Sequence, residues 1–225
     1  MKNVNEATYT MFHLSKFIMK GRERLYKCFL EHIDITEQVT LLDIGATSDR
    51  KNADSNFFIK KFFTRCKNIT ALSNENAQWL EEEFPGLTFL LGDGRNLPFG
   101  DNSFDLVFSN AVIEHVGSLE QQERFLLESY RVAKKYVFLT TPNRWYPIEF
   151  HTIIPFIHYL PKAWHRKILS FIGYSFFSKE ENLNLLDKRT LTMLLEKNGI
   201  TSYSVGTIPF FCLPSNIYVC IKKEE

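Results

Sequence analysis

The chain has 225 residues, of which 44% are hydrophobic, 24% charged and 15% aromatic, so its size and composition fit one folded domain and exclude a disordered chain. Lys and Arg number 27 and Asp and Glu number 26, which gives a formal charge of +1 and no electrostatic reason to expect nucleic acid as a partner. The four cysteines form no CxxC pair, and no stretch resembles a signal peptide or a membrane-spanning helix. We therefore expect a reduced, cytoplasmic protein that is soluble or at most peripheral to a membrane.

Short apolar runs alternate with helical patterns along the chain. The first helix is predicted at residues 17–32. Strands are predicted at residues 39–44, 69–72, 87–91, 104–108, 136–140, 201–205 and 217–221. Further helices are predicted at residues 58–66, through Trp79 and Leu80, from the capping box of Ser118 and Gln121, and between Asp187 and Gly199. This alternation predicts right-handed crossovers and a doubly wound, mostly parallel α/β sheet.

Ligands of such sheets bind beyond the carboxyl ends of the strands. Asp43 and Gly45 lie at the end of the first predicted strand, and glycine there lets the backbone approach a ligand closely. The G-x-G-x-x-G fingerprint of dinucleotides is absent, which disfavours NAD. An acidic side chain at this position suits a ligand with a positively charged amino group or with sugar hydroxyls.

Four segments within residues 39–143 resemble a known family. They are LLDIGATSD (residues 41–49), GDGRNLPF (92–99), SFDLVFSNAVIEHV (103–116) and RVAKKYVFLTTPN (131–143). Through them the chain resembles the class I S-adenosylmethionine-dependent methyltransferases, in particular the methyltransferase type 11 group. The resemblance implies a Rossmann-like, seven-stranded sheet with an antiparallel last strand, and S-adenosyl-L-methionine as the cofactor lying across the strand ends.

The resemblance also implies roles for residues at those ends. Asp43 and Gly45 would flank the methionine part of the donor, and Asp93, with Gly94 beside it, would accept a hydrogen bond from the adenine amino group. Asn110 and Ala111 would line the sulfonium side. The alternative is that Asp43 and Asp93 only cap turns and that Asn110 is a turn residue.

The chain departs from the family pattern in two places. The glycine-rich run after the first strand is reduced to Gly45 and a loop of about ten residues, from which we expect Asp49, Asp54 or Asn56 to close over the donor. The acidic residue that usually holds the ribose is replaced by Ser73, Asn74 and Glu75. Of these we favour Glu75, although a solvated carboxylate at a helix N-terminus is the alternative.

Transfer of a methyl group to a hydroxyl requires a base, for which His115, Glu149 and His151 are the candidates. The alternative for His115 is a hydrogen bond within the core. No metal site is predicted, because the seven-residue spacing of His151, His158 and His165 would separate them by about 10.5 Å along a helix.

The chain is predicted to form a single methyltransferase domain over residues 1–225. Its expected parts are an N-terminal helical segment (1–36), a donor-binding core (37–143), an inserted lid (144–186) and a C-terminal helix with strands (187–225). The insertion is rich in apolar residues and carries Lys162, Arg166 and Lys167. It is either a pair of core-packing helices or an acceptor lid that contacts a lipid-linked substrate or a membrane surface.

The predicted function is methyl transfer from S-adenosylmethionine to a small-molecule or glycan acceptor, with O-methylation of a sugar or lipid-linked sugar favoured. An acceptor that carries phosphate would fit the basic residues of the insertion. The alternatives are a non-catalytic subunit that binds S-adenosylmethionine or S-adenosylhomocysteine and regulates a partner, and a nicotinamide-dependent reductase.

Overall fold

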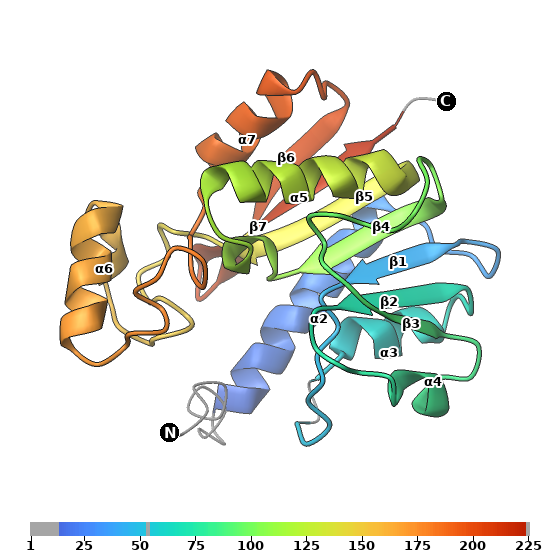
Figure 1. Cartoon of the computed structure of the whole chain (residues 1–225), viewed down its shortest axis with the longest axis horizontal. Coiled ribbons are helices and arrows are strands. Elements are labelled where there is room, and N and C mark those ends of the chain that lie inside the picture. Colours follow the sequence, from blue (N-terminus) through green and yellow to red (C-terminus); the bar gives the residue numbers. More distant parts are fainter. Residues whose placement is uncertain (1–13, 53–54, 224–225) are drawn as a thin grey trace.

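The computed structural model describes residues 14–52 and 55–223 (Figure 1). Seven strands form one sheet in the order β3-β2-β1-β4-β5-β7-β6, in which β7 alone runs antiparallel to the others. The strands are β1 (Leu41–Ile44), β2 (Ile69–Ser73), β3 (Thr88–Leu91), β4 (Phe104–Asn110), β5 (Ala133–Pro142), β6 (Tyr203–Phe210) and β7 (Leu213–Lys222). The doubly wound, seven-stranded methyltransferase-like sheet with an antiparallel last strand is thus confirmed.

Helices cover both faces of the sheet (Figure 1). They are α2 (Leu14–His32), α3 (Phe57–Phe63), α4 (Leu80–Glu83), α5 (Leu119–Val132), α6 (Lys162–Phe171) and α7 (Lys188–Lys197), with 3-10 turns η1 (Ile113–His115) and η2 (Ile157–Tyr159). Ser118 caps α5 by accepting from the Gln121 N–H, and Asp187 caps α7 by accepting from the Thr190 N–H. Both predicted caps are therefore present, and each satisfies a backbone donor that the first helical turn leaves free.

The alternating side chains of β1 divide the core into two layers. Leu41 packs in the cluster that contains Phe29 of α2 and Phe62 of α3, whereas Leu42 packs in the cluster that contains Leu126 of α5 and Leu194 of α7. All four residues of β1 are buried, as expected for a central strand covered on both faces.

Several strands extend beyond the predicted bounds because polar residues at their ends are buried and hydrogen-bonded. In β4, the Ser109 hydroxyl donates to the Ile44 carbonyl oxygen, and in β5 Thr140 and Thr141 are buried. A hydropathy pattern marks such residues as the end of a strand, whereas the parallel ladder continues through Asn110.

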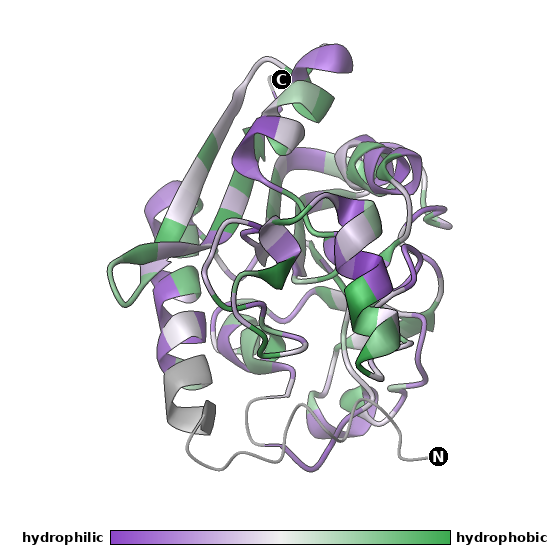
Figure 2. Cartoon of the chain, turned by 90° about the vertical axis from the view of Figure 1, so that its left-hand side faces the viewer, coloured by the Kyte–Doolittle hydropathy of each residue, from purple (hydrophilic) through white to green (hydrophobic). Residues whose placement is uncertain are grey.

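The insertion contains one α-helix, α6, rather than the pair of helices considered above. It lies beyond the carboxyl ends of β4 and β5 (Figure 1). The side chains of Phe171 and Trp164 are 91% and 63% exposed, so much of its apolar surface is not packed in the core. Figure 2 views the molecule from this side and shows hydrophobic segments next to hydrophilic ones. Within the described residues, no helix has the length and apolar character needed to span a bilayer.

Candidate active site

The end of β1 presents a buried acid followed by a glycine. The Asp43 side chain is in strand register with Ala71 and Phe108, and it is 7% exposed. Burial raises the pKa of this carboxyl group to about 7, since a charged carboxylate is poorly solvated there. A ligand that brings positive charge to this place would favour the ionised form.

Gly45 allows the chain to turn away from the sheet. Its φ of +107° is disfavoured for residues with a side chain, and a Cβ atom would lie 2.2 Å from Cγ2 of Val112. Its N–H donates to the Leu72 carbonyl oxygen. The glycine is therefore required by packing as well as by any approach to a ligand.

The long loop after β1 is held by its own polar side chains. Asp49 accepts from the Asn52 amide and the Ser55 hydroxyl, and Asn56 exchanges hydrogen bonds with the backbone of Thr47. Asp54, one of the residues expected to close over the donor, lies outside the described residues. These hydrogen bonds connect the described beginning of the loop, residues 47–52, to Ser55 and Asn56 at its end.

Glu75 contacts the same loop from the end of β2. Its carboxylate accepts from the Ser48 hydroxyl at 2.6 Å, and its N–H donates to the Ser73 hydroxyl at 3.1 Å. The residue is exposed. It is thus available to ribose hydroxyls and also links the first two strand ends.

Asp93 follows β3, and both of its carboxylate oxygens are bound by Arg95. The Arg95 Nε atom lies 2.9 and 3.0 Å from the two oxygens, and the hydrogen bond from Arg95 lowers the pKa of Asp93. Arg95 also donates to the Val116 carbonyl oxygen. An adenine amino group would have to share this carboxylate with Arg95, a feature that the sequence pattern does not indicate.

Gly94 has a packing role that the sequence does not reveal. A Cβ atom at this position would lie 2.5 Å from the Phe125 ring of α5 and 3.0 Å from Ile44. The glycine therefore lets the loop after β3 lie against α5 and the end of β1.

Asn110 and Ala111 end β4 beside β5. The Asn110 Oδ1 atom accepts from the Thr140 hydroxyl at 2.7 Å, and the Ala111 N–H donates to the Thr140 carbonyl oxygen at 2.9 Å. Ala111 has a φ of +55°, which is uncommon outside glycine and reverses the chain into η1. The sheet order then places the ends of β3, β2, β1 and β4 in succession along one edge.

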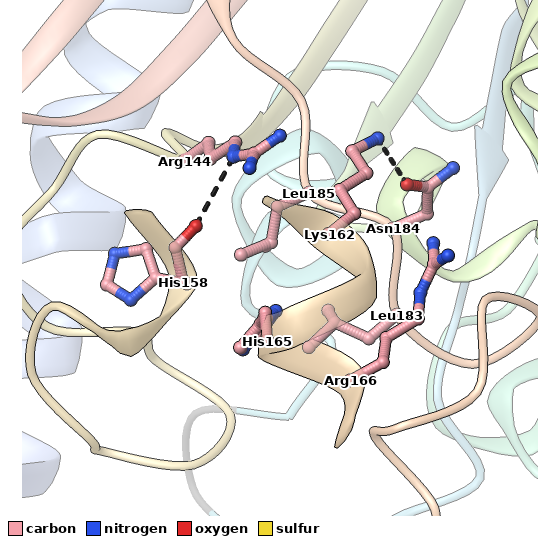
Figure 3. A pocket seen from close by; sticks show the side chains of 8 residues that line it. All are labelled: Arg144, His158, Lys162, His165, Arg166, Leu183, Asn184 and Leu185. Carbon is pink, nitrogen blue, oxygen red and sulfur yellow. Dashed lines mark hydrogen bonds between the residues drawn. The ribbon is translucent and has the colours of Figure 1, made fainter. Parts of the chain in front are cut away.

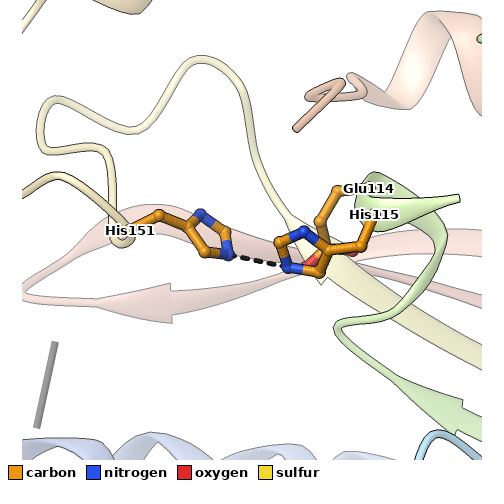
Figure 4. A group of neighbouring side chains, drawn as sticks. All are labelled: Glu114, His115 and His151. Atoms are coloured by element: carbon orange, nitrogen blue, oxygen red, sulfur yellow. Dashed lines mark hydrogen bonds and ion pairs between the residues drawn. The ribbon is translucent and has the colours of Figure 1, made fainter. Parts of the chain in front are cut away.

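Two histidines from distant segments meet next to this edge (Figure 4). The Nε2 atoms of His115, at the end of η1, and His151, in the insertion, are 3.0 Å apart. The Nδ1 atom of His115 lies 2.7 Å from the Asn182 carbonyl oxygen, and that of His151 lies 2.6 Å from Oε1 of Glu149. Because both acceptors are oxygens without a proton, each Nδ1 atom carries the hydrogen and each Nε2 atom of a neutral ring has a free lone pair.

The surrounding charges give the two rings different proton affinities. Burial lowers the pKa of His115. Burial acts in the same direction on His151, but the hydrogen bond and the charge of Glu149 outweigh it and raise the pKa of His151. Although burial opposes its ionisation, the Glu149 carboxyl group has a pKa lowered to about 2, chiefly by its hydrogen bond with His151. A proton between the two rings is therefore bound to Nε2 of His151, which donates a hydrogen bond to Nε2 of His115.

Glu114 is a member of this group to which sequence reasoning assigned no role. Its side chain is fully buried, and its Oε2 atom accepts from the Thr141 hydroxyl at 2.9 Å. Among the described residues its Oε1 atom has no hydrogen-bond partner, and it lies 3.9 Å from Nε2 of His115. The signal was a charged residue next to the apolar residues Val112 and Ile113.

The other two histidines of the insertion contribute to a separate, basic pocket (Figure 3). Arg144 donates to the carbonyl oxygens of His158 and Leu160, and Lys162 donates to the Asn184 side chain. Within the described part of the chain, neither Arg144 nor Lys162 forms an ion pair with a carboxylate. The Asn184 N–H donates to the Glu114 carbonyl oxygen at 2.7 Å, which connects this pocket to the histidine pair. The pocket is lined by Arg144, His158, Lys162, His165, Arg166, Leu183, Asn184 and Leu185.

Comparison with known proteins shows what the core of the chain is similar to. Residues 35–139 match the family model described as a methyltransferase domain. Norajmaline N-methyltransferase from Rauvolfia serpentina is 39% identical over 82 residues, which cover 33% of this chain and 26% of that protein. The chain spans between about a quarter and two fifths of the length of the curated relatives it matches.

Solved structures agree on the fold. A SAM-dependent methyltransferase from Aquifex aeolicus has a TM-score of 0.55 at 15% identity, covering 87% of this chain and 88% of its own. The N-methyltransferase NodS from Bradyrhizobium japonicum, in complex with S-adenosyl-L-homocysteine, has a TM-score of 0.60 at 11% identity, covering 99% and 97%. Together with the strand order, these similarities show that the chain has the fold of S-adenosylmethionine-dependent methyltransferases and that residues 35–139 are similar to a methyltransferase domain.

Proposed function

We propose that this protein transfers the methyl group of S-adenosylmethionine to a hydroxyl oxygen of a small-molecule or glycan acceptor, most specifically of a sugar or a lipid-linked sugar. The observation that carries the proposal is the linked set of Glu149, His151 and His115 beside the carboxyl ends of β4 and β5. A hydroxyl must lose its proton on methylation, whereas a neutral amine can attack through its own lone pair.

The donor site proposed here is the edge formed by the ends of β1 to β4. We expect the donor's amino group near Asp43, its ribose near Glu75 and its adenine near Asp93. The backbones at Gly45 and Gly94 would allow close approach, and Asn110 and Ala111 would face the sulfonium group. We expect the donor to lie close to the histidine pair, because His115 comes five residues after Asn110.

The chemistry required of the protein is mainly alignment, since the sulfonium methyl group is already electrophilic. Bringing the acceptor oxygen in line with the methyl carbon and excluding water supplies most of the rate gain. His151 in its neutral form accepts the hydroxyl proton at Nε2, and Glu149 stabilises the resulting imidazolium through Nδ1. Once protonated, His151 donates from Nε2 to Nε2 of His115, which stabilises the imidazolium further.

The basic pocket supports an acceptor with an anionic group. Arg144, Lys162 and Arg166 line it, and Arg166 is paired with Glu180 at 2.8 Å. Burial is the main cause that lowers the pKa of Lys162, and the positive charges of Arg144 and Arg166 lower it further. Binding of an anion beside these groups would therefore be favourable. A phosphate of a nucleotide-linked or lipid-linked sugar would place a sugar hydroxyl toward the connected histidine pair.

N-methylation is the second candidate, because the relative and the solved structure named above are N-methyltransferases. An amine acceptor would not need the Glu149–His151 pair as a base. The two candidates are separated by the atom that receives the label and by the effect of His151→Ala.

The test uses isotopically labelled S-adenosylmethionine with a panel of nucleotide-linked and lipid-linked sugars and a matched panel of amines. We expect a methyl ether on the sugar, identified by mass spectrometry. His151→Ala should lower turnover by about 10²–10⁴-fold while donor affinity, measured by calorimetry, is unchanged. His32→Ala, which removes an imidazole on α2, is the control and should retain turnover.

The pH profile gives a second readout. Because Glu149 raises the pKa of His151, Glu149→Gln should shift the acid limb of turnover toward lower pH while reducing the maximal rate. Methylated amines with undiminished turnover in His151→Ala would favour N-methylation, and donor binding without any labelled product would contradict both candidates.

A further inference from the structure

The histidine pair has a geometry that two neutral rings cannot hold without a positive charge between them. Both Nδ1 atoms donate outward, to Asn182 and to Glu149, so the two Nε2 lone pairs face each other at 3.0 Å. Lone pairs at this distance repel unless a proton or a metal ion lies between them. The pair is therefore a preformed acceptor of a cation.

A third ligand atom comes from Glu114. Its Oε1 atom is buried, lacks a hydrogen-bond partner in the part of the chain that the structure describes, and lies 3.9 Å from Nε2 of His115. One ligand atom each of Glu114, His115 and His151 lies within 4.8 Å of the others. An unpaired carboxylate oxygen in a buried position costs free energy, so its persistence beside two aligned imidazoles independently indicates a cation.

We infer that Glu114, His115 and His151 bind a divalent transition-metal ion of the Zn²⁺ type. Ligand atoms bound at about 2.0–2.2 Å around a tetrahedral ion lie about 3.3–3.6 Å apart, so only small side-chain rotations are needed. Two imidazoles and one carboxylate are one of the ligand sets found in catalytic zinc sites, which keep a position open for water or substrate. The His115 and His151 side chains are 34% and 17% exposed, which leaves a route for the ion.

The outer contacts match those of metal-bound histidines. The ligating histidine of a metal site usually donates its other N–H to a carboxylate or a carbonyl oxygen, as His151 does to Glu149 and His115 does to Asn182. Glu149 is itself fixed by the N–H and hydroxyl of Thr152. With neutral imidazoles, the two carboxylates of the group carry a formal charge of −2, which a divalent ion cancels.

This site deepens the proposed function, on which its role in turnover rests. With Nε2 of His151 bound to the ion, His151 would no longer act as the base. The ion would instead lower the pKa of an acceptor hydroxyl held at its open position, and the proton would pass to solvent. Metal binding itself requires neither donor nor acceptor, so the two proposals can fail separately.

The experiment measures metal binding by the full-length, tag-free chain. After removal of metal and addition of Zn²⁺, we expect about one ion per chain by elemental analysis, and Co²⁺ as a probe should give a visible spectrum typical of nitrogen and oxygen ligands. His151→Ala and Glu114→Gln should lose this binding. Glu149→Gln, which keeps all three ligands, should weaken it by about 10–100-fold.

His32→Ala is the control and should bind as the wild type does. If Glu114→Gln fails to fold, His115→Ala serves in its place, because that side chain is partly exposed. Absence of stoichiometric binding in the wild type, or unchanged binding in His151→Ala and His115→Ala, would overturn the inference. Methyl transfer without metal binding would overturn this site alone, whereas metal binding without methyl transfer would count against the proposed function alone.

Discussion

At the scale of single residues, the two acids expected to hold the donor have opposite environments. Asp43 is buried and its pKa is raised to about 7 by loss of solvation. Asp93 is about half exposed, and the hydrogen bond from Arg95 lowers its pKa. The two carboxyl groups therefore ionise in different pH ranges, and a positively charged ligand would change the ionisation of Asp43 more than that of Asp93.

The first prediction concerns the pH dependence of stability at Asp43. Its pKa in the folded state is above that of the unfolded chain, so the associated stabilisation is full below the unfolded value and is lost as pH rises through about 7. Between pH 8 and pH 5 the free energy of unfolding of the wild type should gain roughly 2–3 kcal/mol relative to Asp43→Asn. Urea unfolding of both proteins measures this gain, and parallel pH curves would mean that the carboxylate is solvated.

The second prediction separates a donor contact from a structural ion pair at Asp93. Asp93→Ala should weaken binding of S-adenosylhomocysteine by about 1–3 kcal/mol through loss of the adenine contact. Arg95→Ala removes the ion pair but keeps the carboxylate, so its effect should be smaller. Calorimetry on both variants tests this, and equal losses would mean that Asp93 acts only by shaping the loop.

At the scale of elements, the site depends on how η1 packs against its neighbours. Gln122 of α5 donates to the carbonyl oxygens of Ile113 and Asn184, which holds η1 beside the segment that carries Asn182. On the other side, Val112 packs against Gly45 at the end of β1. These contacts, rather than any helical repeat, position His115.

The third prediction tests the packing of β1 against η1. Gly45→Ala adds both backbone strain at φ +107° and a clash with Val112, so it should cost about 1–3 kcal/mol of stability or more. Gly173→Ala is a matched control, because its φ is +92° and nothing lies within 4 Å of the added Cβ atom. Adding Val112→Ala to Gly45→Ala should recover the part due to the clash, as measured by chemical unfolding. If Val112→Ala recovers none of the lost stability, the whole cost of Gly45→Ala arises from backbone strain.

At the scale of the whole molecule, one edge of the sheet gathers segments that are far apart in sequence. The ends of β1 to β4 and the insertion around α6 meet there (Figure 1). A ligand at this edge would contact several elements at once and would bind the folded chain much better than the unfolded one. Stability should therefore respond to the donor or its demethylated product.

The fourth prediction follows from this linkage. S-adenosylhomocysteine at about 100 times its dissociation constant should add about 2.7 kcal/mol and raise the Tm by about 5–10 °C. Asp43→Ala and Asp93→Ala should each reduce the increase at the same ligand concentration. If the Tm of the wild type does not change when the ligand is added, the proposed donor site at this edge is contradicted.

The sequence by itself determined the alternation of strands and helices, the caps at Ser118 and Asp187, and the placement of Asp43 near the end of one strand and of Asp93 after another. These features are local, because periodicity reports which face of an element is buried and caps involve residues three positions apart. It also predicted the antiparallel last strand through the family resemblance. A hydropathy pattern could not predict that polar residues at the ends of β4 and β5 are buried.

Only the tertiary structure decided which polar groups meet. His115 and His151 are 36 residues apart, and Asn182 lies 67 residues from His115, so their contacts depend on how the insertion folds back over the sheet edge. The burial of Glu114 likewise arises from three-dimensional packing, whereas Arg95, which binds Asp93, is only two residues away in the sequence. A sequence pattern records the type and spacing of side chains, whereas the proton affinity and ligand set of a site depend on neighbours that distant segments bring together.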